Sequence, residues 1–348
     1  MKPALLWVCY LLVACTPPEP QRYDSELLVM GTRANISIWS DTPTHAATIT
    51  RQIEHQLTQQ GIDWYAWSPD PRSELRRLNA AIKQGQPFTA SDNLTNLLTM
   101  TLQIHQASLG YFDPAVMPMT EAWGFADNQQ PPTTEIPETA LRNWHISHPK
   151  LTDLTVQNRS ISSRHRDLQL DLGGIAKGYA LDLAMTTLRQ LGVTQSCMNL
   201  GGQLLVMGTT LPDSCKWINL QDPRSENSLG KIEILDGESI STSGDYQRHG
   251  TIQGQSIHHL LDPHTGMPVM HTQCVTVVAS SAILADAAST ALMAAGPDHW
   301  QAVAKNLGIR KALRIDNMGH IEVSKDLYPH LRLLQQTLNN HPFAIVTL

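Results

Sequence analysis

The sequence predicts an α+β fold of mixed, largely antiparallel sheets with packed helices. Apolar residues recur at helical spacing in several segments of the 348-residue chain. From Leu168 onward, short runs typical of β-strands appear between the helical segments. The two kinds of segment do not alternate strictly, as the βαβ units of a parallel sheet would require, so an α+β arrangement is favoured. The length allows two or three structural units, or one large domain.

Helices dominate the predicted first half of the chain. Residues 27–39 are predicted as a strand entered through Gly31, because Ile36 and Ile38 alternate with polar residues. Proline-bearing residues 128–137 predict a surface loop. Apolar stripes and capping residues predict helices over residues 44–61, closed by Gly61, over the residues leading to Asn79, and over residues 91–110 with Ser91 or Asp92 as cap.

Strands and two helices make up the predicted second half. A helix over residues 175–191 ends at Gly192, and a small, apolar helix over residues 282–295 ends at Gly296. Residues 311–323 predict a hairpin around the turn at residues 317–319. The other short β-like runs are residues 168–172, 197–207, 217–220, 232–235 and 274–279.

Composition excludes one broad class of partner. Hydrophobic residues make up 41% of the chain and charged residues 16%, which is ordinary for a globular protein with a real core. The net charge of -6 argues against nonspecific nucleic-acid binding, since that requires a basic surface. We therefore expect no nucleic-acid partner.

The N-terminus has the pattern of a bacterial signal peptide. One lysine precedes an apolar run that is too short to span a bilayer. The residues ending at Cys15 resemble a lipobox, in which cleavage leaves a lipidated cysteine. An ordinary secreted protein with a coincidental cysteine is the alternative. The lipoprotein interpretation predicts a signal peptide at residues 1–14, a lipidated Cys15 with a tether at residues 15–26, and a single domain at residues 27–348. It places the protein on the periplasmic side, attached to a bacterial membrane by the lipid anchor.

Three cysteines remain after such processing: Cys197, Cys215 and Cys274. They allow at most one internal disulfide, so the chain is not a disulfide scaffold. Their spacing does not match a zinc site. Cys197 and Cys274 lie in apolar strand-like runs and are expected in the core.

The stretch DLGGIAKGYALD, residues 171–182, combines glycines with charges at the start of a helix. Backbone N–H groups at a helix start attract anions, and glycines let a phosphate approach the main chain. Lys177 lies in the first turn, where a cation is unfavourable unless an anion accompanies it. The alternative is a tight turn with Asp171 as cap and Lys177 in solvent. Asp182 is expected to bond neighbouring backbone rather than a ligand.

A second candidate site lies in residues 280–292, SSAILADAASTAL. Asp286 stands alone in a small, apolar helix, and Ser289 and Thr290 fall on its side at i+3 and i+4. Such oxygen ligands suit Mg²⁺. The alternative is that Thr290 bonds its own helix backbone and Asp286 caps the first turn.

Two further motifs are ambiguous. His259 precedes an apolar pair and Asp262, so it is either an acid/base group with its orienting acid or a structural histidine beside a turn. The glycine pair at Gly201 and Gly202 interrupts a strand pattern, which suggests a bulge or close approach of a ligand.

Taken in order, these motifs resemble the FAD:protein FMN transferase (ApbE) family. The segments are DLGGIAKGYALD, NLGGQL, STSGDYQR, HLLDPHTGMPV and ADAASTALM, preceded by Met30-Gly31-Thr32, by Ser73-Glu74-Leu75 and by Gly110-Tyr111-Phe112-Asp113. The resemblance covers residues 27–292. It implies a T-fold-related ApbE-like flavin transferase domain that holds FAD in a cleft between sub-regions, in proteins that are periplasmic or lipid-anchored.

The resemblance also implies an activity and a set of site residues. Members bind FAD and Mg²⁺ and move FMN onto a Thr or Ser hydroxyl of an acceptor flavoprotein, releasing AMP. We expect that acceptor to be a subunit of a membrane redox complex. His259 would be the catalytic base, and Asp286 would act in catalysis as a metal ligand. The other implied metal ligands are the main-chain oxygen of Gly174, Ser289 and Thr290. The implied FAD-binding residues are Met30, Trp67, Tyr111, Phe112, Asp113, Asp171, Lys177, Leu260 and Leu261.

Two rival functions use the same residues. One is a Mg²⁺-dependent FAD pyrophosphatase, with water in place of the acceptor hydroxyl. The other is a lipoprotein that binds FAD without chemistry, which the Asp286 and Thr290 pair argues against. An NAD-type dehydrogenase is excluded, because Gly173, Gly174 and Gly178 do not form the G-x-G-x-x-G fingerprint.

Overall fold

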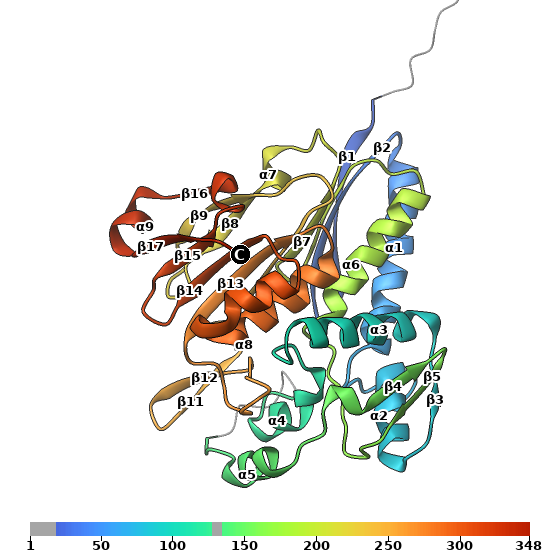
Figure 1. Cartoon of the computed structure of the whole chain (residues 1–348). Coiled ribbons are helices and arrows are strands. Elements are labelled where there is room, and N and C mark those ends of the chain that lie inside the picture. Colours follow the sequence, from blue (N-terminus) through green and yellow to red (C-terminus); the bar gives the residue numbers. More distant parts are fainter. Residues whose placement is uncertain (1–18, 127–133) are drawn as a thin grey trace, which may run out of the picture.

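A nine-stranded sheet forms the centre of the molecule, as the computed structural model shows for residues 19–126 and 134–348 (Figure 1). Its order is β1-β2-β6-β7-β10-β13-β14-β15-β17. Neighbouring strands are antiparallel except for β15 and β17, which are parallel. The strands are β1 (Gln21–Val29), β2 (Thr32–Ser40), β6 (Ser196–Leu200), β7 (Gln203–Met207), β10 (Ser239–Gly244), β13 (Thr272–Ala279), β14 (Lys311–Asp316), β15 (Ile321–Ser324) and β17 (Phe343–Val346).

Different layers cover the two faces of this sheet. Helices α1 (Pro43–Asp63), α6 (Ala176–Gln190) and α8 (Ala282–Asn306) pack on one face and form the main core with it. A second apolar cluster lies on the other face, beneath a three-stranded sheet in the order β16-β9-β8. The elements of this layer are α7 (Asp213–Lys216), β8 (Trp217–Gln221), β9 (Ser228–Glu233), β16 (Leu331–Leu333), the 3₁₀ turn Tyr328–His330 and α9 (Gln335–Asn340).

The remaining elements gather at one end of the molecule, in the lower half of Figure 1. They build a three-stranded sheet, β3-β5-β4, several helices and the hairpin of β11 and β12. The helices are α2 (Glu74–Gln84), α3 (Asp92–Ala107), α4 (Met117–Ala122) and α5 (Glu138–Ile146), with 3₁₀ turns at Pro114–Val116 and Leu151–Asp153. The strands are β3 (Phe88–Thr89), β4 (Leu154–Gln157), β5 (Ser160–Ser163), β11 (His249–Ile252) and β12 (Gln255–His258).

The α+β prediction is confirmed, and the predicted helices lie close to α1, α2, α3, α6 and the first part of α8. The sequence did not predict the short helices α4, α5, α7 and α9. Ser91 caps α3 by accepting the Leu94 N–H, as the capping pattern predicts. Gly296 has φ 63° and ends the first part of α8 at the predicted residue. Helix α1, however, runs past Gly61 to Asp63.

The N-terminal strand prediction is wrong in its extent. Residues 27–39 are two strands of a hairpin, and Met30 and Gly31 form its turn with φ of 52° and 71°. Strand β1 starts at Gln21, so residues 21–26 of the predicted tether belong to the folded sheet. The sequence did not reveal this part of the strand, because its side chains are mostly exposed and an edge strand needs few apolar residues. The predicted signal peptide, Cys15 and most of the loop at 128–137 lie outside the described residues.

Residues 168–172 are extended but pair with no strand. Leu168, Leu170 and Leu172 point inward and are fully buried, which is the alternation that the sequence shows. The Asn79 side chain bonds both the N–H and the carbonyl of Leu170, at 3.0 Å each. A side-chain amide thus replaces the neighbouring strand, because it offers one donor and one acceptor at the spacing of a peptide group.

The glycine pair also has a simpler role than predicted. Gly201 and Gly202 have φ of 60° and 91° and form the two-residue turn between β6 and β7. Positive φ at both central residues is typical of the turn that matches the twist of a hairpin. The pair is therefore a hairpin turn and not a bulge.

Helices α6 and α8 cross in direct backbone contact at Gly178. A Cβ atom there would overlap the Ala282 carbonyl oxygen and come within 2.6 Å of Ile283 Cα.

Within the described residues, no helix is both long enough and apolar enough to cross a bilayer.

Replacing Gly178 by alanine should therefore destabilise the protein. Separating two backbones inside a packed core costs about 1–3 kcal/mol, and the cost is expected at the upper end because no flexible side chain can yield. Thermal unfolding of Gly178→Ala measures the loss, with Thr186→Ala on the exposed face of α6 as the control. Equal melting temperatures for the two variants would contradict the close crossing.

Candidate active site

A buried carboxylate lies where α6 meets α8. Asp286 is 5% exposed, and its Oδ2 accepts the Gly178 N–H at 3.0 Å. Its Oδ1 lies 3.6 Å from the Lys177 ammonium, which also donates to the Gly173 carbonyl at 3.0 Å. The isolated acid of the sequence thus meets a cation from the DLGGIAKGYALD motif. Two motifs that are more than 100 residues apart form one polar site.

Hydroxyl groups extend this site along α8 and β10. Ser289 Oγ lies 2.8 Å from Ser243 Oγ, and Thr290 Oγ1 lies 3.4 Å from the same atom. Gly174 is beside them, since a Cβ on it would lie 3.3 Å from Thr290 Oγ1. Residues Gly174, Asp286, Ser289 and Thr290 therefore converge, and Ser243 joins them from the adjacent strand.

This donor set fits a hard cation. It offers one carboxylate and several neutral oxygens, which is the chemistry that Mg²⁺ accepts when other sites are left for water and phosphate. The described residues contain no cluster of three His, Cys, Asp or Glu side chains, so a softer, nitrogen- or sulfur-rich metal site is not available there. The alternative interpretation, in which hydroxyls of α8 bond the backbone of their own helix, also holds in part. Ser289 and Thr290 donate to the Asp286 carbonyl at 2.9 and 3.4 Å.

Two cations border the turn before α6. Asp171 Oδ1 accepts the Gly173 N–H at 2.9 Å and so caps the turn. Burial raises the pKa of Asp171 above its usual range, while the Gly173 N–H and the charges of Arg248 and Lys177 oppose that shift. Arg248 and Lys177 thus lie within electrostatic reach of the same carboxyl. Arg248 is in the STSGDYQR segment, but nothing in the sequence singles it out from the other arginines.

His259 is held in one tautomer beside these cations. Its Nδ1 lies 3.3 Å from the Arg248 carbonyl oxygen, which can only accept, so the proton is on Nδ1 and Nε2 is the basic nitrogen. Loss of solvation, followed by the positive charge of Arg248, lowers the pKa of His259 to about 3. Asp262 does not orient this ring, contrary to one of the two sequence interpretations. Its carboxylate bonds His264 and Thr265 instead.

The Tyr111-Phe112-Asp113 segment connects this region with a pocket. Phe112 is buried, and a Cβ on Gly174 would lie 3.3 Å from its ring, so the segment reaches the turn before α6. Tyr111 stacks on His299 at 5.8 Å and meets His264 edge-on at 4.5 Å. Sequence patterns do not single out either residue, because His264 is an exposed histidine in a turn and His299 is an exposed histidine in the second part of α8.

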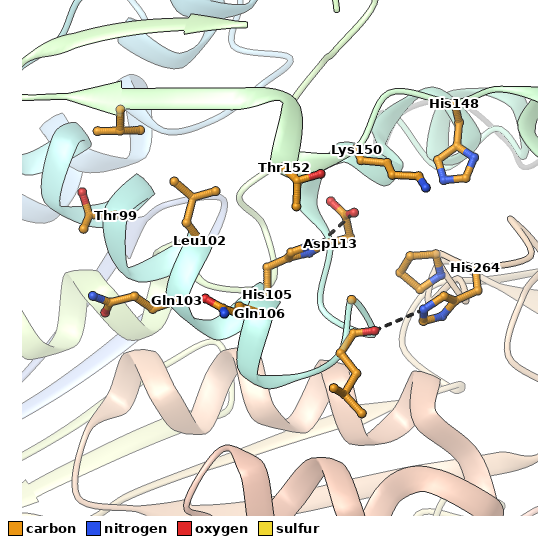
Figure 2. Close-up of a pocket in the computed structure, with 14 residues that line it drawn as sticks. Thr99, Leu102, Gln103, His105, Gln106, Asp113, His148, Lys150, Thr152 and His264 are labelled. Carbon is orange, nitrogen blue, oxygen red and sulfur yellow. Dashed lines mark hydrogen bonds and ion pairs between the residues drawn. The ribbon is translucent and has the colours of Figure 1, made fainter. Parts of the chain in front are cut away.

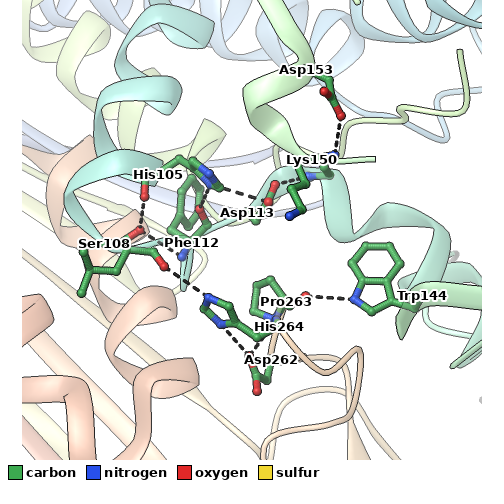
Figure 3. A network of polar contacts seen from close by, with 12 residues as sticks. His105, Ser108, Phe112, Asp113, Trp144, Lys150, Asp153, Asp262, Pro263 and His264 are labelled. Atoms are coloured by element: carbon green, nitrogen blue, oxygen red, sulfur yellow. Dashed lines mark hydrogen bonds and ion pairs between the residues drawn. The ribbon is translucent and has the colours of Figure 1, made fainter. Parts of the chain in front are cut away.

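Asp113 points into a pocket of about 850 Å³ between α3 and the loop that carries His264 (Figure 2). Its Oδ2 lies 3.6 Å from His105 Nδ1, and its Oδ1 accepts the Ala115 N–H at 2.8 Å. Burial raises the pKa of Asp113, although a charged His105 would lower it. Figure 3 shows His105, Asp113 and His264 within one network of polar contacts.

The other predicted FAD contacts are Met30, Trp67, Leu260 and Leu261. Met30 packs against Gly61 near the end of α1. Leu260 has both backbone groups engaged, by His258 and Val269, and Leu261 is bridged to Pro268. Trp67 is half-buried, and its buried Nε1 has no hydrogen-bond partner among the described residues. An indole N–H without an acceptor is what a missing ligand would leave behind.

The profile of the ApbE family matches residues 30–313 of this chain. The chain belongs to the ApbE family. The FAD:protein FMN transferases of Klebsiella pneumoniae and Escherichia coli K12 are each 30% identical to it, over 318 and 320 residues. These matches cover 88% of this chain in both cases, and 89% and 90% of the relatives. The FAD:protein FMN transferase of Rhodobacter capsulatus is 34% identical over 322 residues, which are 92% of this chain but 60% of that relative.

Solved ApbE structures share the fold. The ApbE protein of Thermotoga maritima matches with a TM-score of 0.77 and 27% identity, covering 90% of this chain and all of that one. The flavin transferase ApbE of Vibrio cholerae gives the same TM-score and coverage at 25% identity. The flavinyl transferase ApbE of Pseudomonas stutzeri, in its apo form, gives 0.73 at 28% identity and covers 86% of this chain and 92% of its own.

Asp182 has a positioning role in this ApbE chain that extends the sequence expectation. It bonds backbone, but that of α8 rather than of its own helix. Its carboxylate accepts the Ala282 and Ile283 N–H groups at 2.9 and 3.0 Å and the Ser281 hydroxyl at 2.9 Å. An acid at a helix N-terminus stabilises the helix. Asp182 thereby fixes α8 one turn before Asp286.

Trp67 should contribute to flavin binding mainly through its aromatic face, since its half-buried ring packs at the edge of the core. Trp67→Ala removes the ring, and we expect FAD affinity to fall roughly 10-fold, as for loss of one aromatic contact. Quenching of flavin fluorescence measures the affinity. Trp67→Phe is the matched control, since it keeps an aromatic face and should stay within about 3-fold of the wild type. Unchanged quenching in Trp67→Ala would show that another aromatic residue meets the flavin.

Proposed function

We propose that this chain is an FAD:protein FMN transferase that moves FMN from FAD onto a Thr or Ser hydroxyl of an acceptor flavoprotein. FMN becomes attached through a phosphoester bond, and AMP is released. One observation carries the proposal: the buried Asp286 meets Lys177 and a group of hydroxyls in a chain that matches the ApbE family over residues 30–313. Relatives bearing the name FAD:protein FMN transferase support it.

The charges of the site suit a diphosphate substrate. Lys177 and Arg248 supply two cations near the glycine turn, and glycines without side chains let a phosphate approach the main chain. The free indole N–H of Trp67 and the aromatic Tyr111 offer contacts for the flavin or adenine rings. FAD is bound as a substrate, with its diphosphate oriented by these groups.

Mg²⁺ is the metal we propose for this site. Asp286, Thr290, Ser289 and the main-chain oxygen of Gly174 would hold it. When bound, it neutralises charge on the diphosphate as the phosphoanhydride bond breaks. Lys177 lies against the same carboxylate and keeps the site charge-balanced in its absence.

His259 is the proposed general base. Its Nε2 takes the proton of the acceptor hydroxyl, whose oxygen forms a bond to the FMN phosphorus. The bond from that phosphorus to the bridging oxygen breaks, and AMP leaves with the electron pair. The Arg248 carbonyl holds the Nδ1–H throughout. An anionic diphosphate beside the ring raises the basicity of His259 above its value in the free protein.

We further propose that the mature protein is a periplasmic lipoprotein anchored through Cys15. The lipobox-like sequence before Cys15 supports this, as does the start of β1 at Gln21, only a few residues after the proposed lipid. A short tether keeps the site close to the membrane surface, where a membrane redox subunit could serve as acceptor.

Mass spectrometry of a full-length candidate acceptor tests the activity. The acceptor is incubated with this protein, FAD and Mg²⁺, and AMP is measured in parallel. We expect a mass gain equal to one FMN together with release of AMP. Release of free FMN and AMP without an adduct would identify a pyrophosphatase. No AMP at all, with FAD bound, would identify a binding protein. The Asp286→Asn variant provides the inactive reference.

A further inference from the structure

The part of the chain that the structure describes holds three free cysteines. Two of them, Cys197 and Cys215, are separated in sequence but lie near one another in the fold. Cys197 is in β6 and Cys215 is in the short helix α7, and both belong to the apolar cluster beneath β8 and β9. Cys274 is in β13 and is buried in the same cluster. All three are free thiols in the structure.

Arg22 of β1 lies close to both Cys197 and Cys215. Its guanidinium donates to Ser37 Oγ at 3.2 Å and to Ser214 Oγ at 3.3 Å. Ser37 is the direct cross-strand partner of Cys197, and Ser214 precedes Cys215. Arg22 therefore spans the two sites, and the thiols themselves are close enough to share a hydrogen bond.

The same arrangement makes the two thiols unequal. The hydrogen bond from Cys197, aided by the positive charge of Arg22, lowers the pKa of Cys215 to about 7. The hydrogen bond to Cys215 and burial raise the pKa of Cys197. A thiol with a pKa near 7 is partly thiolate at neutral pH and attacks disulfides readily. Cys274 has no such partner, and burial raises its pKa.

We propose that Cys197 and Cys215 form a disulfide bond in an oxidising environment and that Cys274 stays reduced. The oxidant is a disulfide compound, such as oxidised glutathione or an exposed protein disulfide. The Cys215 thiolate attacks one sulfur of this oxidant, forms a mixed disulfide and releases one thiol. The Cys197 thiolate then attacks the Cys215 sulfur and releases the second thiol. The protein loses two electrons and two protons, which the oxidant takes up.

The bond would stabilise the fold without entering the active site. It links β6 to α7, whose four residues can open locally to admit the oxidant, and it closes the loop between them. Figure 1 shows α7 at the end of the molecule opposite α4 and α5. The disulfide should therefore raise the melting temperature by about 5 °C and leave the rate of AMP release unchanged. The proposal does not depend on the transfer activity.

Peptide mapping of the full chain tests the pairing. The protein is purified with reductant, equilibrated in a buffer of oxidised and reduced glutathione, alkylated and digested without reduction. We expect one linked pair, the Cys197 and Cys215 peptides, with alkylated Cys274. The variants Cys197→Ser and Cys215→Ser should both lose the link and the response of the melting temperature to reductant. Cys274→Ala is the matched control and should keep both.

Three outcomes would overturn the proposal. One is full alkylation of Cys197 and Cys215 after oxidation in the wild type. Another is a link that involves Cys274. The third is equal melting temperatures for the oxidised and reduced wild type, which is decisive even if a serine variant fails to fold.

Discussion

Asp286→Asn should abolish nearly all Mg²⁺-dependent turnover while the protein remains folded. The amide has the size of the carboxylate, and its oxygen can still accept the Gly178 N–H. What is lost is the negative charge that faces Lys177 and that would hold the proposed divalent cation. Charge stabilisation of this kind is worth several kcal/mol, so we expect AMP release to fall on the order of 10³-fold.

The experiment separates the metal from the fold. AMP release is measured over a series of Mg²⁺ concentrations, and FAD affinity is measured by fluorescence. Asp236→Asn is the matched control, because Asp236 is an exposed acid that accepts the N–H of Gly208, the residue after β7. It removes the same charge without touching α6 or α8. Wild-type turnover in Asp286→Asn would remove Asp286 from the metal site.

His259→Gln should slow the chemical step by about 10²–10⁴-fold, the usual contribution of a general base. Glutamine keeps a donor for the Arg248 carbonyl but has no basic nitrogen. FAD affinity should not change, so the loss should appear in single-turnover transfer to the acceptor. His249→Gln is the control, since His249 is an exposed residue of the neighbouring strand β11. A wild-type single-turnover rate would exclude His259 as the base.

The low pKa of His259 gives a second, independent test. The residue has a pKa of about 3 in the folded protein and about 6.5 when unfolded, so the unfolded chain binds one more proton between these values. Stability contributed by neutral His259 is therefore present above pH 6.5 and is lost as the pH falls toward 3. Over that pH range, the melting temperature of His259→Gln should fall less steeply than that of the wild type. Parallel curves would show that His259 is not desolvated.

Local patterns in the sequence were enough to predict the longer helices, but not the short helices α4, α5, α7 and α9. Ser91, for example, caps α3 through its own segment, and Gly296 ends the first part of α8 by its own backbone conformation. Strand boundaries were less predictable. Alternation in residues 168–172 reports burial but not the partner, and Asn79 takes the place of a strand. The glycine pair between β6 and β7 suggested a bulge, because the φ angles that make it a hairpin turn cannot be read from the residue types.

The site was predictable only as separate pieces. Asp286 suggested a functional site because it stands alone among alanines. Lys177 suggested one because glycines surround it. Their meeting depends on the crossing at Gly178, which no spacing along the chain encodes. Ser243 and Arg248 were missed for the same reason, since each joins the site through the packing of β10 or the loop after it.

The amide of Gly178 gives the site a natural spectroscopic reporter. The ¹⁵N chemical shifts of glycine amides lie apart from those of most other residues. The Gly178 N–H donates to Asp286 Oδ2, beside the proposed cation. Any change in the charge on that carboxylate must polarise the N–H bond. Titrating ¹⁵N-labelled protein with Mg²⁺ in the absence of substrate should therefore shift the Gly178 amide signal. The occupancy of the metal site could then be followed without an enzymatic assay.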